Sequence, residues 1–394
     1  MKRHWFVVAA FLAGSCVSAP RVIEISKKGE GKISINLSGY RTGNDAASKT
    51  FISVLKADLN RSGYFTVSSA GAQMNVAGSC TAGSQMKADV QVYQAATRQR
   101  KLGKTYQAPA NSARGLAHKV ADEIVFAVIG KKGMASGKIA MVGTRTGRKE
   151  LYICDMDGKN MRQVTKDNSI VVGPRWTPDG KNLTYTSYKR GYPNVFMTGR
   201  GKPLSSHGGL NASGAISPNG KSMAVILSKD GNPELYIKSL RTGRLTRLTK
   251  SQRYNEADPC WSPDGNHIVF VSDSSGRPQI YIISKNGGKA NRVSSSGTES
   301  VAPDWGKNGL ITYSSRVGGK YKVMIVNPVS RTARQLESDW ADYEDPCWAP
   351  DGRHIVCSRT ANYQSSIYLL DTLKDSPVTL ISGSGDWYSP ACSP

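Results

Sequence analysis

Hydrophobic positions in the last two-thirds of the chain alternate with polar ones over short runs. β-branched and apolar residues dominate these runs, and polar turns that contain Gly separate them, which is the pattern of β-strands. One such run recurs in every unit of the pattern, at residues 139–142, 182–185, 222–227, 267–271, 310–313 and 354–357. The pattern predicts an all-β region built from many short strands.

A block of eight residues precedes five of these six runs. The first copy reads Gly-Pro-Arg-Trp-Thr-Pro-Asp-Gly, and Pro, Asp and Gly are the residues that favour a tight turn. The five copies stand at 173–180, 213–220, 258–265, 302–309 and 345–352, and residues 389–394 repeat the block as far as its second Pro position. Successive copies of that position are 40, 45, 44, 43 and 44 residues apart. A period of this size indicates propeller blades or solenoid units.

Each unit contains four predicted strands, which is the content of one propeller blade. The run at 139–142 has no block before it, and the block at 389–394 has no run after it. Pairing these two segments would close six blades into a ring and remove the open sheet edges, and it would account for the stop at Pro394. We therefore predict a six-bladed β-propeller over residues 135–394, closed by pairing of its N-terminal and C-terminal strands.

Two residue types recur inside the repeat. Four tryptophans stand at the same position of the block, where we expect packing between neighbouring blades, with a ligand stacked on each ring as the alternative: Trp176, Trp261, Trp305 and Trp348. Six cysteines follow residue 20, and either disulfides or packing as small apolar side chains would explain them: Cys80, Cys154, Cys260, Cys347, Cys357 and Cys392. No Cys-x-x-Cys is present and the five histidines are scattered, so we predict no metal site.

The region before the repeat, residues 33–134, has the pattern of a separate α/β domain. Apolar residues fall at helical spacing in 46–61 and 113–128, and Gly63 and Gly130 follow as helix stops. Alternating runs at 32–37, 64–67 and 88–93 predict strands. The densest basic cluster of the domain is expected to be a solvated hairpin, with a polyanion site as the alternative: Arg98, Arg100, Lys101 and Lys104.

The first nineteen residues have the pattern of a secretory signal peptide. Lys2 and Arg3 precede an apolar run that is too short to span a bilayer, and small residues follow it. Residues 13–16 form a weak lipoprotein box, and we favour soluble export over a lipid anchor. Residues 20–32 are basic and contain Gly, which predicts a flexible N-terminal arm. The pattern places the mature protein outside the cytoplasm.

The chain is strongly basic, with 53 Lys and Arg against 29 Asp and Glu and a formal net charge of +24. The excess is spread over both regions, since residues 20–136 carry 17 basic and 7 acidic side chains and residues 137–394 carry 34 and 22. Such a charge predicts attraction to polyanions in general, for example anionic polymers of the cell envelope. Export argues against nucleic acid as the partner.

Two segments resemble the TolB family of the periplasmic Tol–Pal system. Residues 51–65 (Phe-Ile-Ser-Val-Leu-Lys-Ala-Asp-Leu-Asn-Arg-Ser-Gly-Tyr-Phe) are similar to the family's first-helix motif, and residues 117–142 resemble its crossing from the small domain into the propeller. The repeated Pro-x-Trp-Ser-Pro-Asp-Gly block matches as well, although many propellers share it. The block of residues 302–309 departs from it, with Gly306-Lys307 in place of Ser-Pro, and Cys392 stands where Trp is usual.

The resemblance implies a non-enzymatic adaptor without a cofactor, and a monomer. Members of the family bind the peptidoglycan-associated lipoprotein Pal at the channel mouth and TolA of the inner membrane through the arm, and they support outer-membrane integrity and constriction at division. On this sequence the arm residues are Arg21, Ile23, Ile25, Lys27 and Lys28. The mouth would be built from the loops that lead into the Pro-x-Trp strands, which contribute Asn168, Asn211, Ser213, Arg253, Asn255, Glu256, Glu299, Asp342, Glu344, Asp345, Asp386 and Trp387. Several of these are acidic, which predicts a locally negative mouth and a basic partner surface.

Two other functions are weighed against the adaptor. A propeller hydrolase of the peptidase type needs a nucleophile elbow, and no Gly-x-Ser-x-Gly, Walker loop or His-Glu-x-x-His is present. A protein that binds cell-wall polyanions is supported by the net charge alone. The sequence predicts no catalytic residues.

Overall fold

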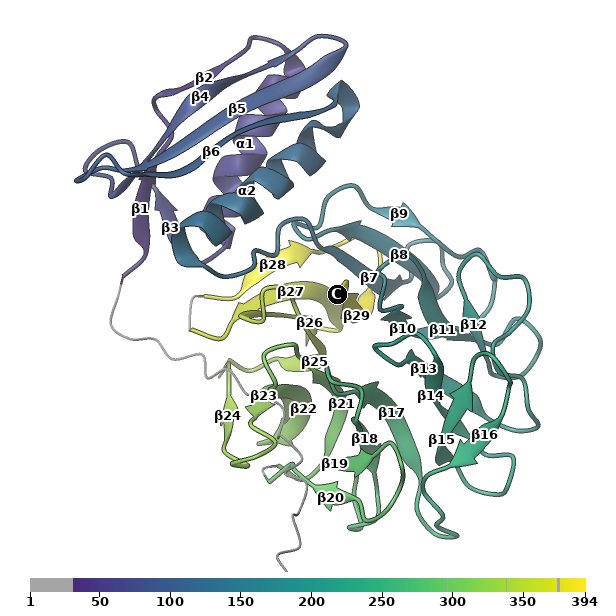
Figure 1. Ribbon diagram of the computed structural model, residues 1–394. Coiled ribbons are helices and arrows are strands. Elements are labelled where there is room, and N and C mark those ends of the chain that lie inside the picture. The colour runs from purple at the N-terminus through teal and green to yellow at the C-terminus, as the bar shows by residue number, and fades with distance from the viewer. Residues whose placement is uncertain (1–30, 296, 338, 374–375) are drawn as a thin grey trace, which may run out of the picture.

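The computed structural model describes residues 31–295, 297–337, 339–373 and 376–394. These residues form a small α/β domain that is followed by a six-bladed β-propeller (Figure 1). The signal peptide of residues 1–19 and the five arm residues from Arg21 to Lys28 lie outside the described residues. The fold class expected from the sequence is confirmed.

The small domain places two helices against one sheet with the strand order β3-β1-β4-β5-β6, and β2 pairs with β4 (Figure 1). Pairing is parallel between β1 and both β3 and β4, and antiparallel along β4, β5 and β6. The elements are β1 (Ile33–Asn36), β2 (Tyr40–Thr42), α1 (Ala46–Arg61), β3 (Phe65–Val67), β4 (Met74–Ala82), β5 (Gln85–Gln94), β6 (Arg100–Pro109), η1 (Ala110–Ser112) and α2 (Ala113–Ile129).

Local interactions explain where α1 begins and where α2 ends. Asp45 caps α1, since its Oδ1 accepts a hydrogen bond from the Ser48 amide at 2.7 Å. Gly130 ends α2 at φ 75°, a left-handed conformation that glycine adopts without steric cost. The predicted helices are confirmed, the second with one additional residue.

The sequence patterns did not indicate β2, β4 or β6, and the hairpin of β5 and β6 carries the exposed basic cluster that was expected there.

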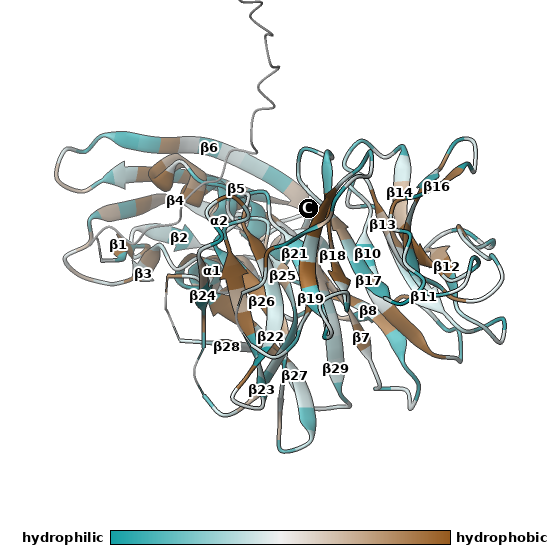
Figure 2. Cartoon of the chain, turned by 90° about the horizontal axis from the view of Figure 1, so that it is seen from below, coloured by the Kyte–Doolittle hydropathy of each residue, from teal (hydrophilic) through white to brown (hydrophobic). Residues whose placement is uncertain are grey.

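The propeller consists of six sheets around a channel, and its hydrophobic residues concentrate on strands such as β18 and β26 (Figure 2). Blade 1 contains β29 (Trp387–Cys392), β7 (Lys138–Gly143), β8 (Glu150–Asp155) and β9 (Arg162–Gln163), and blade 2 contains β10 (Val171–Trp176), β11 (Leu183–Ser187) and β12 (Asn194–Met197). Blade 3 contains β13 (Asn211–Ile216), β14 (Ser222–Leu227), β15 (Glu234–Ser239) and β16 (Leu245–Arg247), and blade 4 contains β17 (Glu256–Trp261), β18 (His267–Ser272), β19 (Gln279–Ser284) and β20 (Asn291–Arg292). Blade 5 contains β21 (Ser300–Trp305), β22 (Ile311–Val317), β23 (Lys320–Val326) and β24 (Ala333–Gln335), and blade 6 contains β25 (Asp342–Trp348), β26 (His354–Ala361), β27 (Gln364–Asp371) and β28 (Val378–Ile381).

The ring closes as predicted, because β29 is the inner strand of blade 1 and pairs antiparallel with β7. The prediction of four strands in every blade is wrong for blade 2. Its sheet has three strands, and an isolated bridge between Val195 and Ser205 stands where a fourth would be. The segment 199–209 contains four glycines and Pro203, which weaken strand pairing.

The recurring tryptophans pack between blades as expected. Trp261 Nε1 donates to the Ala215 carbonyl of blade 3 at 2.9 Å, and Trp176 Nε1 donates to the Ala391 carbonyl of blade 1 at 3.0 Å. For the cysteines, the sequence left open whether they form disulfides or pack as small apolar side chains, and the structure shows no disulfide among the described residues. All six that the structure describes are free thiols, four of them buried.

Candidate functional site

A β-bulge interrupts the inner strand of every blade at the same point, where two residues face one on the neighbouring strand. The first residue of each bulge has a positive φ between 45° and 60°, and only one of the six is a glycine: Gly173, Ser213, Asp258, Ala302, Asp345 and Ser389. This left-handed conformation is unfavourable for residues with a Cβ. The bulges bring all six residues to the wall of one cavity of about 210 Å³ in the channel.

An ion pair across the channel separates this cavity from a second one. Arg175 of blade 2 reaches Asp304 of blade 5, which is the opposite blade of a ring of six, with Nη1 3.5 Å from Oδ1. Its Nη2 also donates to the Pro303 carbonyl at 3.4 Å. Arg175 lines both the cavity at the bulges and a larger cavity of about 560 Å³ on the other side. We call the channel end at the loops leading into the inner strands the entry-loop mouth, and the other end the domain-side mouth.

The twelve residues predicted for the entry-loop mouth differ in exposure. Asn168, Arg253 and Asn255 are exposed. Six others are partly exposed: Ser213, Glu299, Asp342, Glu344, Asp345 and Asp386. The remaining three, Asn211, Glu256 and Trp387, are buried.

The three buried residues support the loops from inside rather than presenting a surface. The Asn211 side chain accepts hydrogen bonds from the Ser205 hydroxyl and the His207 amide, and it donates to the His207 carbonyl. The Trp387 ring packs edge-on against Tyr152, and its Nε1 donates to the Gly383 carbonyl at 2.9 Å. Each of the three is the first residue of an inner strand, and alternating polarity cannot separate these positions from the exposed ones just before them, because both kinds are polar or aromatic.

Two of the six acidic residues of the mouth are paired with cations, which reduces the negative charge that was expected there. Glu299 lies 3.1 Å from Arg316, and Asp342 lies 2.8 Å from Lys320. Glu344 has no such cation, and burial together with the charges of Asp345 and Asp342 raises the pKa of its carboxyl to about 7. Among the bulge residues, Asp258 and Asp345 are acidic, and burial raises the pKa of Asp345.

The entry-loop mouth also carries exposed apolar side chains that the sequence analysis did not single out. Trp340, in the loop that leads into β25, is 78% exposed, and Ile170 and Tyr254 occupy the corresponding loops before β10 and β17. Tyr192 and Tyr363 extend from turns between second and third strands, which lie at the same end of the blades. The sequence signal that could have revealed these side chains is the presence of aromatic residues inside otherwise polar turn segments. Aromatic side chains surrounded by polar groups are typical of protein-binding surfaces.

The small domain meets the propeller through a buried charge network on blade 1. His118 of α2 lies with Nδ1 2.6 Å from Asp58 of α1 and with Nε2 3.5 Å from Asp155 of β8. Burial disfavours the charged ring, but the interactions with Asp155 and Asp58 outweigh it and raise the pKa of His118 to about 9. Lys138 and Arg114 also pair with Asp155. The network joins both helices to the propeller.

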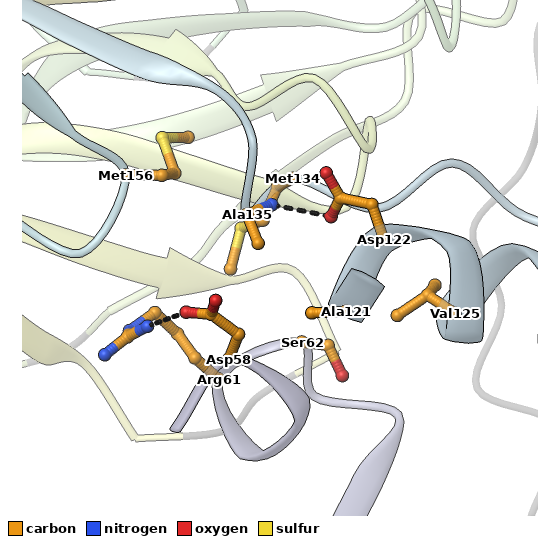
Figure 3. Close-up of a pocket in the computed structure, with 9 residues that line it drawn as sticks. All are labelled: Asp58, Arg61, Ser62, Ala121, Asp122, Val125, Met134, Ala135 and Met156. Atoms are coloured by element: carbon orange, nitrogen blue, oxygen red, sulfur yellow. Dashed lines mark hydrogen bonds and ion pairs between the residues drawn. The ribbon is translucent and has the colours of Figure 1, made fainter. Parts of the chain in front are cut away.

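A small cavity lies beside this network, between the C-terminal end of α1, the middle of α2 and the chain that enters the propeller (Figure 3). Asp122 accepts hydrogen bonds there from the Ala135 and Ser136 amides at 2.8 and 2.9 Å. The cavity has a volume of about 10 Å³, which is room for a single water molecule. Its size excludes a substrate, and the surrounding contacts indicate a structural joint.

The described residues contain one group with the spacing of metal ligands, formed by His118, Asp155 and Asp157. Arg114 and Lys138 already neutralise these carboxylates, and a cation would have to displace them. The residues therefore do not fit a metal ion. The described part of the chain contains no helix long and apolar enough to cross a membrane.

Comparison with known proteins agrees with this architecture. The family described as TolB beta propeller domain matches residues 126–394. The Tol-Pal system protein TolB of Desulfosudis oleivorans is 31% identical over 186 residues, which are 46% of this chain and 42% of that protein. The first curated relatives are thus matched over only about two fifths of their length.

Two further relatives are matched almost completely. The Tol-Pal system protein TolB of Gluconobacter oxydans is 29% identical over 424 residues, covering 98% of this chain and 92% of that protein. The crystal structure of TolB from Acinetobacter baumannii superimposes with a TM-score of 0.83 at 27% identity, covering 95% of this chain and 99% of that one. By its repeat, its two-domain architecture and these matches, the chain belongs to the TolB family of β-propeller proteins.

Proposed function

We propose that this chain is a periplasmic adaptor of a Tol–Pal-like system and that it binds a Pal-like lipoprotein at the entry-loop mouth. The observation that carries the proposal is the composition of that mouth on a TolB-family propeller. Loops of different blades present Trp340, Tyr254 and Ile170, and the exposed Arg253 and Asn255 stand beside Tyr254. Aromatic side chains that are exposed in the free protein and have polar neighbours can become buried anchors when a partner binds.

The second partner in this proposal is a TolA-like protein of the inner membrane, bound by the arm of residues 20–32. Its support is the resemblance and the basic composition of the segment. By linking the two partners the protein would support outer-membrane integrity and constriction during division. The basic N-terminal sequence with its short apolar run supports export to the periplasm.

We further propose that the adaptor is not an enzyme. The relatives are named as components of the Tol-Pal system. Assays of the purified protein on peptide and glycoside substrates test this point, and turnover that depends on Asp258 or Asp345 of the channel would contradict it. General attraction of the basic chain to anionic polymers would accompany the adaptor role and be weakened by salt.

A binding experiment with matched variants tests the first partner. The periplasmic domain of the Pal-like lipoprotein from the same organism is titrated into the exported protein by calorimetry. Trp340→Ala is expected to weaken binding at least tenfold, because the exposed ring would be buried in the complex. Val329, 59% exposed in the turn between β23 and β24 at the opposite end of blade 5, provides the control Val329→Ala, with less than a twofold change.

Two outcomes would overturn the proposed docking site. Equal affinity of wild type, Trp340→Ala and Arg253→Glu would place the lipoprotein elsewhere. Recovery of anionic polymers alone in a pull-down from envelope extract would favour the polyanion-binding alternative. Deleting residues 20–32 should abolish capture of the TolA-like partner while leaving lipoprotein binding intact, which separates the two interactions.

A further inference from the structure

The domain-side mouth opens into the larger of the two channel cavities, with a volume of about 560 Å³. Most of its wall is apolar or aromatic. The residues at the last position of the inner strands and at the second Pro position line it, among them Trp176, Trp261, Trp305 and Trp348 with Pro178, Pro218, Pro263, Pro350 and Pro394. This volume and lining are those of a small-molecule site.

The rim of the cavity breaks the repeat at one position. Five blades place a proline there, and blade 5 places Lys307. Lys132, in the segment between the two domains, is close enough that its charge acts together with burial to lower the pKa of Lys307. Neither lysine has an ion-pair partner among the described residues. The rim therefore carries unpaired positive charge.

The acidic group at the base of the cavity is already engaged. Asp304 pairs with Arg175 and accepts a hydrogen bond from the Trp348 amide at 2.8 Å. The Cys260 thiol donates to it at 3.5 Å, and burial raises the pKa of that thiol to about 12, so the sulfur is neutral. The polar groups left for a ligand are the ammonium group of Lys307 at the rim and the indole N–H of Trp348 in the wall, which has no hydrogen-bond partner among the described residues.

We propose that the domain-side cavity is a binding site for a small anionic amphiphile, a molecule with an aromatic or aliphatic body and one acidic head group. The body occupies the space between the indole rings and the prolines, and the head group lies at the rim beside Lys307. The lysines supply the charge complementarity, and burial of the apolar body supplies the affinity. This site lies at the opposite end of the channel from the proposed lipoprotein site and does not depend on it.

Two fluorescent probes that differ in charge test the proposal. 8-Anilinonaphthalene-1-sulfonate is anionic, and N-phenyl-1-naphthylamine has a similar body without the sulfonate. We expect the anionic probe to bind one to one, to quench tryptophan emission by energy transfer and to bind at least fivefold tighter than the neutral probe. Octanoate should displace it at lower concentration than 1-octanol.

Variants locate the probe. Lys307→Met should weaken the anionic probe about tenfold and leave the neutral probe unchanged. The matched control is Lys221→Ala, which removes an exposed lysine from the corresponding turn of blade 3 outside the cavity. Ile216→Trp introduces the residue that four other blades carry at this position of the cavity wall, so it should fold, reduce the free volume and weaken both probes.

The proposal is overturned by equal affinity for the two probes in the wild type, or by an unchanged affinity of Lys307→Met for the anionic probe. Binding at several equivalent sites that Ile216→Trp does not affect would also overturn it, since such binding would be on the outer surface. Thermal melting curves of each variant confirm that the comparison is made on folded protein.

Discussion

The two mouths of the channel are built from the same six strands, yet they differ in chemistry. The domain-side mouth consists of the repeated part of each unit, so Trp and Pro recur around it. The entry-loop mouth consists of the segments between repeats, so every blade contributes a different loop, with Trp340 in one and Arg253 in another. The repeated residues at the domain-side end are used for packing between blades. The loops at the other end differ between blades, so their residues can become specific for a partner.

The largest expected effect comes from removing the ring closure on which both mouths depend. Deleting residues 386–394 removes β29 and exposes β7 as an open edge of blade 1. We expect the thermal midpoint to fall by more than about 10 °C, or the protein to aggregate, because several buried side chains of blade 1 lose their neighbours. Differential scanning calorimetry checks this, and an unchanged transition would contradict closure by β29.

A smaller effect on stability is expected at the domain-side mouth, where Gly306 packs closely against Trp348. A Cβ at Gly306 would lie 2.7 Å from Cγ of Trp348, so Gly306→Ala should lower the free energy of unfolding by about 1–3 kcal/mol. The matched change at the bulge is Ala302→Gly, where φ is 52° and glycine relieves the unfavourable conformation. That variant should be neutral or more stable by up to about 1 kcal/mol. Urea denaturation measures both, and a loss of the same size in both variants would contradict the comparison.

The entry-loop mouth should show a dependence on pH through Glu344. Its pKa is raised to about 7 in the folded protein from an ordinary value near 4.5, so the folded state holds a proton that the unfolded state loses first. The contribution of Glu344 to stability therefore decreases as the pH rises from about 4.5 to 7 and is constant above that.

The variant Glu344→Gln isolates this contribution from those of the other titrating groups. Relative to wild type, it should gain stability across that pH interval and show no further relative change at higher pH. Urea midpoints at half-unit steps of pH provide the measurement. Parallel curves for the two proteins would show that Glu344 titrates in the ordinary range.

The smallest effect is expected for the ion pairs at the loop tips. Lys320→Ala removes the partner of Asp342, which is partly exposed, so the loss of stability should stay below about 1 kcal/mol. The same variant should lower affinity for a partner only when its surface is acidic. A larger loss of stability, measured by urea denaturation at low and high salt, would mean that this pair does more for the fold than its exposure indicates.

Much of the fold could be predicted from the sequence because its signals are local. Gly ends each of the five complete turns, Pro-Asp precedes it in three of them, and the 43–45-residue spacing of most copies fixes the blades. The absence of a fourth strand from the sheet of blade 2 has a local cause in the sequence, because Pro203 and its neighbouring glycines do not favour a strand. This feature could have been predicted. β6 carries little alternation because most of its side chains are exposed, so the pattern did not reveal it.

The candidate site was harder to predict because its decisive features join distant residues. Arg175 and Asp304 are 129 positions apart, and no periodicity predicts that they meet across the channel. Asn211 and Asn255 look alike in the sequence, but the first is buried at the start of β13, where its side chain bonds to the preceding loop, and the second is exposed. The positive φ of Asp258 and Asp345 depends on the bulge, which is a property of two paired strands rather than of one segment.

The Arg175–Asp304 pair has a consequence for how the two ends of the molecule influence one another. The pair spans the channel and Arg175 lines both cavities, so the two chambers share this side chain as a common partition. The partition belongs to neither mouth, and it ties together two blades that share no strand pairing. An occupant that pushed the guanidinium aside from one chamber would change the depth of the other and loosen the tie between opposite halves of the ring.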